Sequence, residues 1–249
     1  MSAASDHLSE RVRAYLPTGP DHTIVDLGCG RGGHLIAHAA AHEGQGGRFV
    51  GLDSSAEAIA AARAAHRDSR VEFAAHDIET RLPFDDGECD AVLSVNTLEA
   101  IRDKGALLTE IHRILKPGGT FVCAHFDWDT QLFDGTDKAT IRTIVHAYAD
   151  WTQPWMATSD AWMGRRLWRT IGETRLFDGV VEPLVLTNTR FVAGEYGFEQ
   201  VQGFRELGRQ GMVRSDLIEG FIADLETLDR AGTYFYAITM FAFVGTCRA

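Results

Sequence analysis

Short apolar runs alternate with helix-forming stretches through the first half of the chain. Five of these runs read TIVDLG, RFVGLD, VEFAAHD, CDAVLSVN and GTFVCAHFD, and the segments between them are rich in Ala, Leu, Glu and Arg. Apolar runs that alternate with helices in this way are typical of βαβ units, in which a parallel sheet is buried on both faces. The pattern therefore predicts an α/β fold with a doubly wound, mostly parallel sheet.

The pattern changes after the fifth run. Residues 131–177 have a helical pattern and hold four of the five tryptophans. Because this segment lies between predicted strands, we expect it to form a helical lid inserted into a single domain that spans residues 1–249. Each of the tryptophans is equally compatible with ordinary core packing, because Trp contributes a large buried area wherever it lies.

Two further apolar runs, EPLVLTNTRF and YFYAITMFAFVGTC, lie on either side of an amphipathic stretch at residues 212–228. Two long strands joined by a helix, the second of them at the C-terminal end, suit a sheet whose last strand runs antiparallel to the others. Together with the first five runs, they predict a seven-stranded sheet with an antiparallel C-terminal strand.

Composition agrees with one ordinary globular domain. The chain has 249 residues, of which 45% are hydrophobic and 24% are charged. A domain of this length can bury a deep core, whereas two independent domains joined by a linker would be short. The formal net charge of -11 argues against a nucleic-acid partner, because proteins that bind phosphates present a basic surface. The charge therefore favours a small-molecule ligand.

Neither a metal centre nor a membrane segment is predicted. The four cysteines, Cys29, Cys89, Cys123 and Cys247, form no Cys-x-x-Cys pair, so no zinc site or disulfide framework is indicated. The N-terminal segment is polar and charged, and no stretch approaches the roughly 20 apolar residues of a membrane-spanning helix. We therefore expect a cytoplasmic protein, monomeric or homodimeric, without a membrane partner.

The most informative segment is IVDLGCGRGGHL, at residues 24–35, which runs from an apolar strand through a glycine-rich turn into a helix. Glycines allow a tight turn and let a ligand approach the backbone amides at the start of a helix. Gly28, Gly30 and Gly33 match the G-x-G-x-x-G pattern of dinucleotide-binding proteins, and Asp53 follows at the expected distance of about 20 residues. An NAD(P)-dependent oxidoreductase is therefore one interpretation of this segment.

Asp26 favours a different ligand. A carboxylate at the end of the first strand would repel the pyrophosphate of a dinucleotide, whereas it would attract a cationic group. S-adenosylmethionine (SAM) carries a sulfonium and an ammonium group, so an acidic site suits it. The chain also lacks a Tyr-x-x-x-Lys pattern or another recognisable hydride-transfer set. These features weigh against the oxidoreductase interpretation.

The same segment resembles motif I of the class I SAM-dependent methyltransferases, with Asp26, Gly28, Gly30 and Gly32 at the acid-x-Gly-x-Gly-x-Gly positions. The resemblance extends over about residues 23–127. Within it, GLDSS matches the segment that holds the ribose-binding acid, and AAHDIETRLPF matches the segment that contacts adenine. The segments DAVLSVNTLEAI and RILKPGGTFVCAH match later elements of the UbiE-like branch. It implies a Rossmann-like methyltransferase fold with SAM as the cofactor. The cofactor-binding residues that it implies are Asp26, Gly28, Cys29, Gly30, Asp53, Ser54, Asp77, Ile78 and Asn96.

The sequence indicates the residues of an acceptor site less directly than those of the cofactor site. Methyl transfer from a sulfonium depends on positioning and exclusion of water, so a catalytic base is not obligatory. His125, at the end of the fifth predicted strand, is the candidate base, although a histidine satisfied by local hydrogen bonds fits as well. Arg165 is a candidate partner for an acceptor carboxylate. The residues expected to form an aromatic wall of the acceptor pocket are Trp128, Tyr148, Trp151, Trp155 and Trp162.

Three functions stay open at this point. The first is transfer of a methyl group from SAM to N, O, C or S of a small-molecule acceptor, aromatic or amine-bearing. The second is the oxidoreductase, and the third is a protein of this fold that binds SAM without catalysis. A nucleobase target is disfavoured, because residues 96–99 read Asn-Thr-Leu-Glu and not the D/N-P-P-Y/F tetrapeptide of enzymes that methylate amines in DNA.

Overall fold

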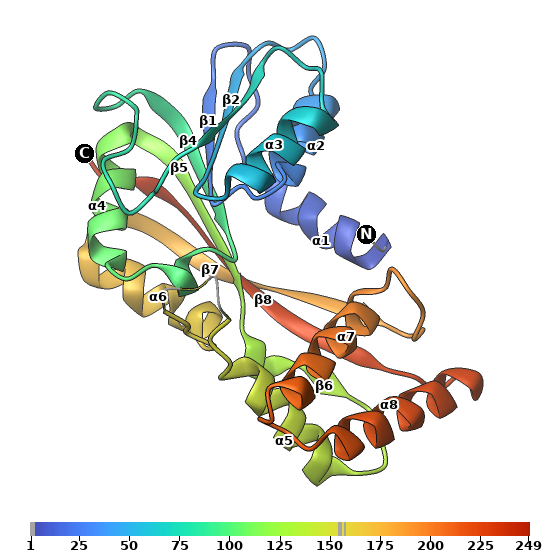
Figure 1. The fold of residues 1–249 in the computed structure, drawn as a ribbon. Coiled ribbons are helices and arrows are strands. Elements are labelled where there is room, and N and C mark those ends of the chain that lie inside the picture. Colours follow the sequence, from blue (N-terminus) through green and yellow to red (C-terminus); the bar gives the residue numbers. More distant parts are fainter. Residues whose placement is uncertain (1–2, 154–155, 157) are drawn as a thin grey trace.

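The computed structural model describes residues 3–153, 156 and 158–249, which form one mixed sheet with helices around it (Figure 1). The strands are β1 (Thr23–Leu27), β2 (Arg48–Asp53), β3 (Val71–Ala75), β4 (Cys89–Val95), β5 (Leu115–Phe126), β6 (Leu132–Phe133), β7 (Phe177–Asn188) and β8 (Tyr236–Cys247). They lie in the order β3-β2-β1-β4-β5-β8-β6, and β7 pairs with β8. Since β8 pairs with β5 and β7 over the same residues, β7 forms the outer edge.

The sheet has the predicted form. β1 to β5 pair in parallel, and the register places Val25 of β1 between Val50 of β2 and Val92 of β4. The C-terminal strand β8 runs antiparallel to both β5 and β7. The eighth strand, β6, was not predicted, because two residues carry no periodic pattern.

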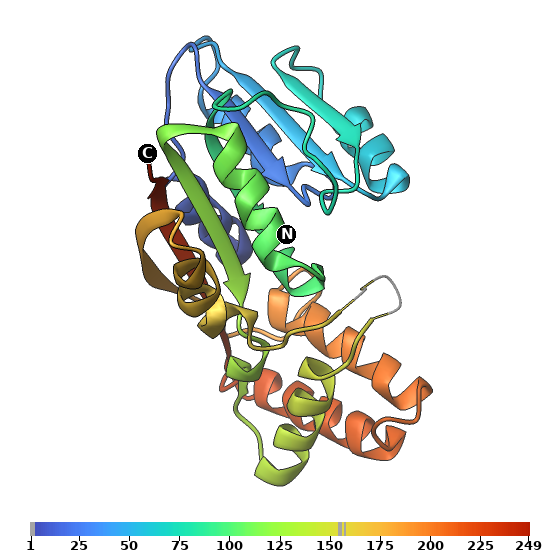
Figure 2. The same ribbon diagram turned by 90° about the vertical axis from the view of Figure 1, so that its left-hand side faces the viewer.

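Helices cover both faces of the sheet. Neighbouring residues of a strand point to opposite faces, so Ile24 and Val25 belong to different apolar clusters. The cluster of Ile24 lies under α1 (Ala3–Arg13), α2 (Gly33–Ala41) and α3 (Ala56–Ala65), and that of Val25 under α4 (Lys104–Ile114) and α6 (Met163–Thr174). Figure 2 shows α4 and α6 on the face turned to the viewer. The strands are therefore apolar on both sides, as their sequences indicate.

Three further helices form a second layer beside the far end of β7 and β8 (Figure 1). They are α5 (Lys138–Ala149), α7 (Tyr196–Arg209) and α8 (Ser215–Arg230), and we call them the helical cap. Phe133 packs edge to face on Phe204 and Phe221, with ring centroids 5.9 and 5.3 Å apart. It also contacts Tyr236 of β8 at 4.6 Å. The cap and the sheet therefore share one continuous core.

The predicted lid at residues 131–177 is divided between two parts of the fold. Its first helix, α5, belongs to the helical cap, but α6 packs on the sheet and buries Met163, Leu167 and Ile171 completely. Gly164 permits this approach, because a Cβ there would lie only 2.9 Å from the carbonyl oxygen of His125. The structure differs from the prediction because the apolar stripe of α6 faces the sheet. The other helices of the cap come from the segment after β7.

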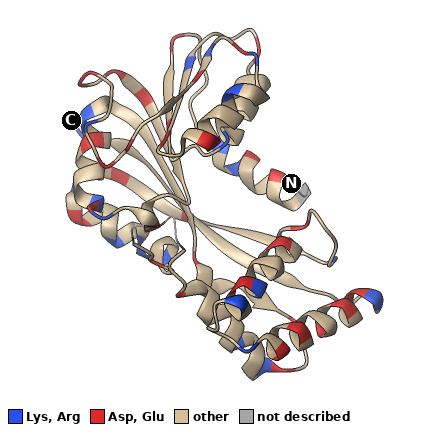
Figure 3. Ribbon diagram, viewed as in Figure 1, with Lys and Arg blue, Asp and Glu red and all other residues tan. Residues whose placement is uncertain are grey.

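No helix of the described residues is long and apolar enough to cross a membrane. Acidic and basic residues are interspersed along α7 and α8 (Figure 3). Some of them pair between the two helices, as where Arg205 Nε donates to Glu219 Oε1 at 3.0 Å. Exposed pairs of this kind add at most about 1 kcal/mol each to stability.

Candidate active site

The glycine-rich loop between β1 and α2 adopts a backbone that requires glycine. Gly28 has a φ of 75° and Gly32 a φ of 77°, in the left-handed region that residues with a Cβ rarely adopt. A Cβ on Gly32 would also collide with the ring of Phe73 in β3. Gly33, by contrast, is the first residue of α2 and has no positive φ. The constrained glycines are therefore those of the acid-x-Gly-x-Gly-x-Gly pattern.

Replacing Gly28 by Ala is expected to lower the free energy of unfolding by about 2 to 4 kcal/mol. The left-handed backbone costs a residue with a Cβ about 1 kcal/mol, and overpacking costs about 1 to 3 kcal/mol. The new Cβ would collide with Oγ1 of Thr97, so adding Thr97→Ala should restore part of the loss. Urea unfolding of both single variants and the double variant measures this coupling. Simple additivity of the two single effects would show that the contact does not exist.

Asp53, at the end of β2, organises the loop and the start of the next helix. Its Oδ2 accepts a hydrogen bond from the backbone N of Gly30 at 2.8 Å, and its Oδ1 accepts one from the backbone N of Ser55 at 2.8 Å. Ser55 in turn caps α3 by accepting from the backbone N of Ala58. Each carboxylate oxygen can accept a second hydrogen bond, so Asp53 can still bind the hydroxyl groups of a ligand.

Asp26 lies beneath the glycine-rich loop and is only 1% exposed. Burial, and next the nearby carboxylate of Asp53, raise the pKa of Asp26 to about 7. Its Oδ2 is buried and has no hydrogen-bond partner among the described residues. Burial likewise raises the pKa of the Cys29 thiol well above its usual value. An unpaired buried carboxylate is costly, and such groups are typical of functional sites.

A first pocket, of about 570 Å³, opens at the C-terminal ends of β1 to β4, the edge where α/β sheets bind their ligands. In the turn after β3, Asp77 Oδ1 accepts from the backbone N of Glu79 at 3.0 Å, and Ile78 is buried. The pocket is lined by Gly28, Asp53, Ser54, Ser55, Asp77, Ile78, Glu79, Asn96, Thr97, Ala100, Ile101 and Arg102. Most of the predicted cofactor residues therefore converge here, whereas Asp26, Cys29 and Gly30 are not among the residues that line the pocket.

Asn96 joins the ends of β4 and β5. It has a left-handed φ of 52°, its backbone N donates to the carbonyl oxygen of Ala124, and its Oδ1 accepts from the backbone N of Phe126. Its amide oxygen is thus used within the fold, while the residue lines both the first pocket and a second one. The two pockets meet at this residue.

The second pocket, of about 220 Å³, lies between the end of β4 and the end of α5. It is lined by Asn96, Glu99, Trp128, Tyr148, Ala149, Trp151, Gln153, Met156 and Ser159. The ring of Tyr148 stands edge to face between those of Trp128 and Trp151, with centroids 6.2 Å from each. Trp128, Tyr148 and Trp151, which were predicted for the aromatic wall, therefore line the same pocket.

Glu99 is the acidic residue among the described residues of this pocket, and sequence reasoning missed it. It belongs to the short helix η1 (Leu98–Ala100) and is 3% exposed. Its Oε2 accepts a hydrogen bond from Nε1 of Trp128 at 2.8 Å. Burial raises the pKa of Glu99 to about 7, although the Trp128 hydrogen bond opposes the shift. The available signal was its place in the segment that follows β4, between the apolar residues Leu98 and Ala100.

His125, the predicted base, lines neither pocket. Its side chain is fully buried, and its Nδ1 donates to the carbonyl oxygen of Phe126 at 2.8 Å. Burial lowers the pKa of His125 to about 4. Its Nε2 lies 3.8 Å from Oε1 of Glu99, which is too far for a hydrogen bond. His125 therefore lies behind Glu99, where a ligand in the second pocket does not contact it.

Arg165 and Trp162 also lie outside the second pocket. Arg165 donates from Nε and from an Nη to the two oxygens of Asp127, each at 2.5 Å, and Asp127 is fully buried. Trp162 is 43% exposed, donates to Asp129, and has the Arg165 guanidinium 4.8 Å from its ring centroid. Both predicted acceptor residues thus stabilise the junction of β5 and α6. Trp155 lies outside the described residues.

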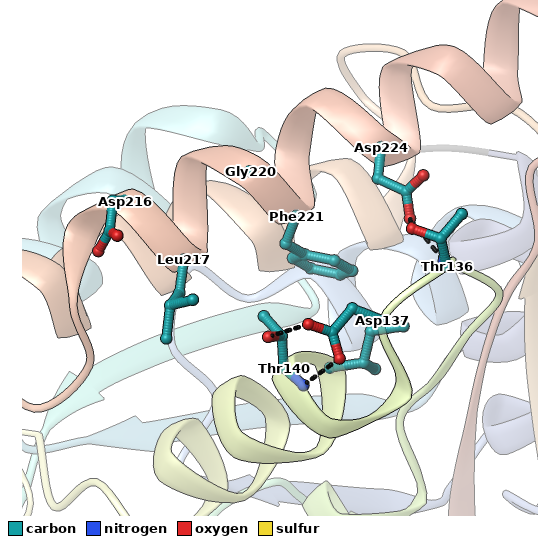
Figure 4. A pocket seen from close by; sticks show the side chains of 9 residues that line it. Thr136, Asp137, Thr140, Asp216, Leu217, Gly220, Phe221 and Asp224 are labelled. Carbon is teal, nitrogen blue, oxygen red and sulfur yellow. Dashed lines mark hydrogen bonds between the residues drawn. The ribbon is translucent and has the colours of Figure 1, made fainter.

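A small hollow between α5 and α8, of about 130 Å³, is structural (Figure 4). Asp137 caps α5 by accepting from Thr140, and Asp224 of α8 accepts from the backbone N of Thr136. The carboxylates of Asp137 and Asp224 thus hold the chain at the start of α5. Among the described residues no group of three or more His, Cys, Asp or Glu side chains is placed to hold a metal ion.

A family model described as a methyltransferase domain matches residues 19–171. The chain is 30% identical over 235 residues to an uncharacterised 37.1 kDa protein in transposon TN4556 of Streptomyces fradiae, covering 92% of this chain and 64% of that protein. It is 36% identical over 142 residues to 24-methylenesterol C-methyltransferase 2 of Oryza sativa subsp. japonica, covering 55% of this chain and 37% of the relative. The chain therefore spans less than two thirds of the length of either relative.

A solved structure with a similar fold is geranyl diphosphate C-methyltransferase from Streptomyces coelicolor A3(2), in complex with Mg2+, geranyl-S-thiolodiphosphate and S-adenosyl-L-homocysteine. It aligns with a TM-score of 0.57 at 20% sequence identity, and the alignment covers 97% of this chain and 76% of that chain. At this identity the likeness concerns the fold.

Proposed function

Since the chain belongs to the family of proteins with a methyltransferase domain, we propose that it transfers a methyl group from SAM to a small-molecule acceptor. One observation carries the proposal: the first pocket, at the C-terminal ends of the parallel strands, and the second, aromatic pocket meet at Asn96. Two ligands bound there would adjoin each other, which is the arrangement that a direct transfer between them requires.

The first pocket suits SAM because its polar groups are mainly acceptors. Asp53 would bind the ribose hydroxyls, Asp77 would accept from the adenine amine, and Ile78 would contact the adenine ring. The charge of Asp26 beneath the loop favours a ligand with a sulfonium and an ammonium group. Arg102 is the one basic residue among the described residues that line the pocket. The same carboxylates would repel a pyrophosphate, which weighs against NAD(P).

The second pocket suits a small acceptor. SAM supplies an electrophilic methyl carbon, so the part of this chain is to hold a nucleophile in line with it and to exclude water. Tyr148 and Ala149 of α5 contribute to the pocket, so the first part of the predicted lid retains its proposed role in enclosing the acceptor. The names of the similar proteins, a sterol and a geranyl diphosphate methyltransferase, support a small organic substrate.

Calorimetric titration with SAM, S-adenosylhomocysteine (SAH) and NADH tests the proposal. We expect SAM and SAH to bind with micromolar-order affinity and NADH not to bind. Asp53→Ala should weaken SAM binding by about 1 to 3 kcal/mol, because charge-assisted hydrogen bonds to the ribose are lost. Glu173→Ala, at an exposed position of α6, is the control with the same loss of charge. Binding of NADH without binding of SAM would refute the proposal, and unchanged affinity in folded Asp53→Ala would remove Asp53 from the site.

A further inference from the structure

We infer that the second pocket selects an acceptor with a basic nitrogen, and that Glu99 binds this nitrogen and removes its proton before methyl transfer. The inference rests on the methyl transfer proposed above and adds the chemical class of the acceptor. It follows from the composition of the pocket wall, the geometry of Glu99 and the charges around it.

The wall of the second pocket combines aromatic faces with one carboxylate. Trp128, Tyr148 and Trp151 supply the rings, Glu99 is the carboxylate, and no Lys or Arg is among the described residues of the lining. Aromatic faces attract cations, and a carboxylate beside them adds a hydrogen-bond acceptor of opposite charge. An acceptor carboxylate would find no cation here, because Arg165 is engaged with Asp127. The wall therefore favours an ammonium group over an anion.

One oxygen of Glu99 is held by a hydrogen bond, and the other accepts no hydrogen bond from the described residues. Oε2 accepts from Nε1 of Trp128, which sets the position of the carboxylate. Oε1 lies 3.8 Å from Nε2 of His125, beyond hydrogen-bond distance. Because Glu99 also lines the pocket, an acceptor nitrogen can approach this carboxylate directly.

The surroundings of Glu99 suit exchange of a proton near neutral pH. Burial raises its pKa to about 7, with a further increase from Asp160, whereas Lys104 and the Trp128 hydrogen bond lower it. A base whose pKa lies near the working pH is the most effective. The titratable groups that face it are His125 on β5, Tyr148 on α5, Tyr196 on α7, Lys104 on α4 and Asp160 before α6.

The proposed step balances without any further reactant. The ammonium of the acceptor gives a proton to the Glu99 carboxylate, which becomes a neutral carboxyl group, and the nitrogen regains its lone pair. That lone pair forms a bond to the methyl carbon while the electrons of the carbon–sulfur bond pass to sulfur. The products are a methylated ammonium and neutral-sulfur SAH. Glu99 then releases its proton to water.

Three aromatic probes of similar size test the inference: benzylamine, benzyl alcohol and benzoate, each titrated into SAH-saturated protein. We expect benzylamine to bind at least tenfold more tightly than the other two. Glu99→Gln keeps an oxygen that can accept from Trp128, and it should weaken benzylamine binding at least tenfold with SAH affinity unchanged. Glu99→Asp, which keeps the charge, should retain the preference for benzylamine. Glu173→Gln is the control with the same change of charge on the outer surface of α6.

A second readout follows methylation of benzylamine with methyl-labelled SAM across pH 6 to 9. The rate of the wild-type protein should show a titration step near pH 7, where Glu99 ionises. In Glu99→Gln this step should be absent, and the rate should follow only the deprotonation of the free amine. Equal binding of the three probes, no binding of benzylamine, or a Glu99→Gln variant that matches Glu173→Gln would overturn the inference. If the wild-type protein fails to bind SAH, the proposed function fails instead, so the two failures are distinguishable.

Discussion

Ligand-free Asp26→Asn is expected to be more stable than the wild-type protein at pH 8, by up to about 4 kcal/mol. Burial and the Asp53 carboxylate raise the pKa of Asp26 from its ordinary value of 3.8 to about 7. Three pKa units correspond to about 4 kcal/mol. Asparagine has nearly the same shape but no charge, so the variant avoids the cost of ionising a buried carboxyl group.

The sign of the pH dependence follows from linkage. The native state holds the Asp26 proton more tightly than the unfolded state does, so this group stabilises the fold fully below about pH 4. The contribution is lost as the pH rises through about 7. The advantage of Asp26→Asn should therefore grow between pH 4 and pH 7 and stay constant above. Urea unfolding of both proteins at pH 5 and at pH 8 measures the difference.

Two comparisons make the Asp26 test specific. Asp21→Asn, at an exposed position, removes the same charge and should show no gain that depends on pH. Asp26→Asn should also weaken SAM more than SAH, because SAM alone carries the sulfonium charge. An equal gain at pH 5 and pH 8 would contradict the assignment of the effect to Asp26 ionisation. We therefore expect Asp26 to lower the stability of the ligand-free protein while it strengthens binding of the cofactor.

Arg165→Ala is expected to lower the free energy of unfolding by about 3 to 5 kcal/mol. The substitution leaves the fully buried carboxylate of Asp127 without the two hydrogen bonds that it accepts from the guanidinium. The backbone N of Arg165, at 3.2 Å, is a weak replacement. Urea unfolding at pH 7 measures the loss. The double variant with Asp127→Asn should recover part of it, because the buried charge is then removed as well.

The neighbouring residue provides the control. Arg166 pairs with Asp160 at 2.7 Å, but both side chains are partly exposed, so Arg166→Ala should cost at most about 1 kcal/mol. An Arg165→Ala protein that keeps its stability yet loses acceptor turnover would contradict the structural role. It would instead support the prediction from sequence that Arg165 binds an acceptor carboxylate.

The sheet and the first pocket were predictable because their signals are local. A buried parallel strand is apolar at successive positions, as Ile24 and Val25 show, and the glycine-rich loop requires residues without a Cβ where φ is positive. Asp53 and Asp77 follow directly from strand ends, so a correct strand assignment places them at one edge of the sheet. The local sequence pattern and the topology of a parallel sheet were together sufficient to predict the sheet and the position of the first pocket.

The second pocket depends on contacts between distant segments. Glu99 and Trp128 meet only because β4 and β5 are neighbours, and Tyr148 joins them only because α5 folds back over both. Trp162 was assigned to the pocket for its ring alone, but the apolar stripe of α6 at Met163 and Leu167 turns that ring outward. His125 was assigned from its strand end, and β8 then encloses it. A sequence pattern gives no direct measure of such packing.

The segment 96–102 contributes residues to both pockets. Glu99 lines the second pocket, Thr97, Ala100, Ile101 and Arg102 line the first, and Asn96 lines both. Under the proposed function, a substitution at position 99 would change the acceptor that is methylated while leaving the lining of the first pocket unchanged. Over evolutionary time, copies of a gene with this arrangement can diverge in the compound that they bind by a change at position 99, while the neighbouring residues of the first pocket are preserved.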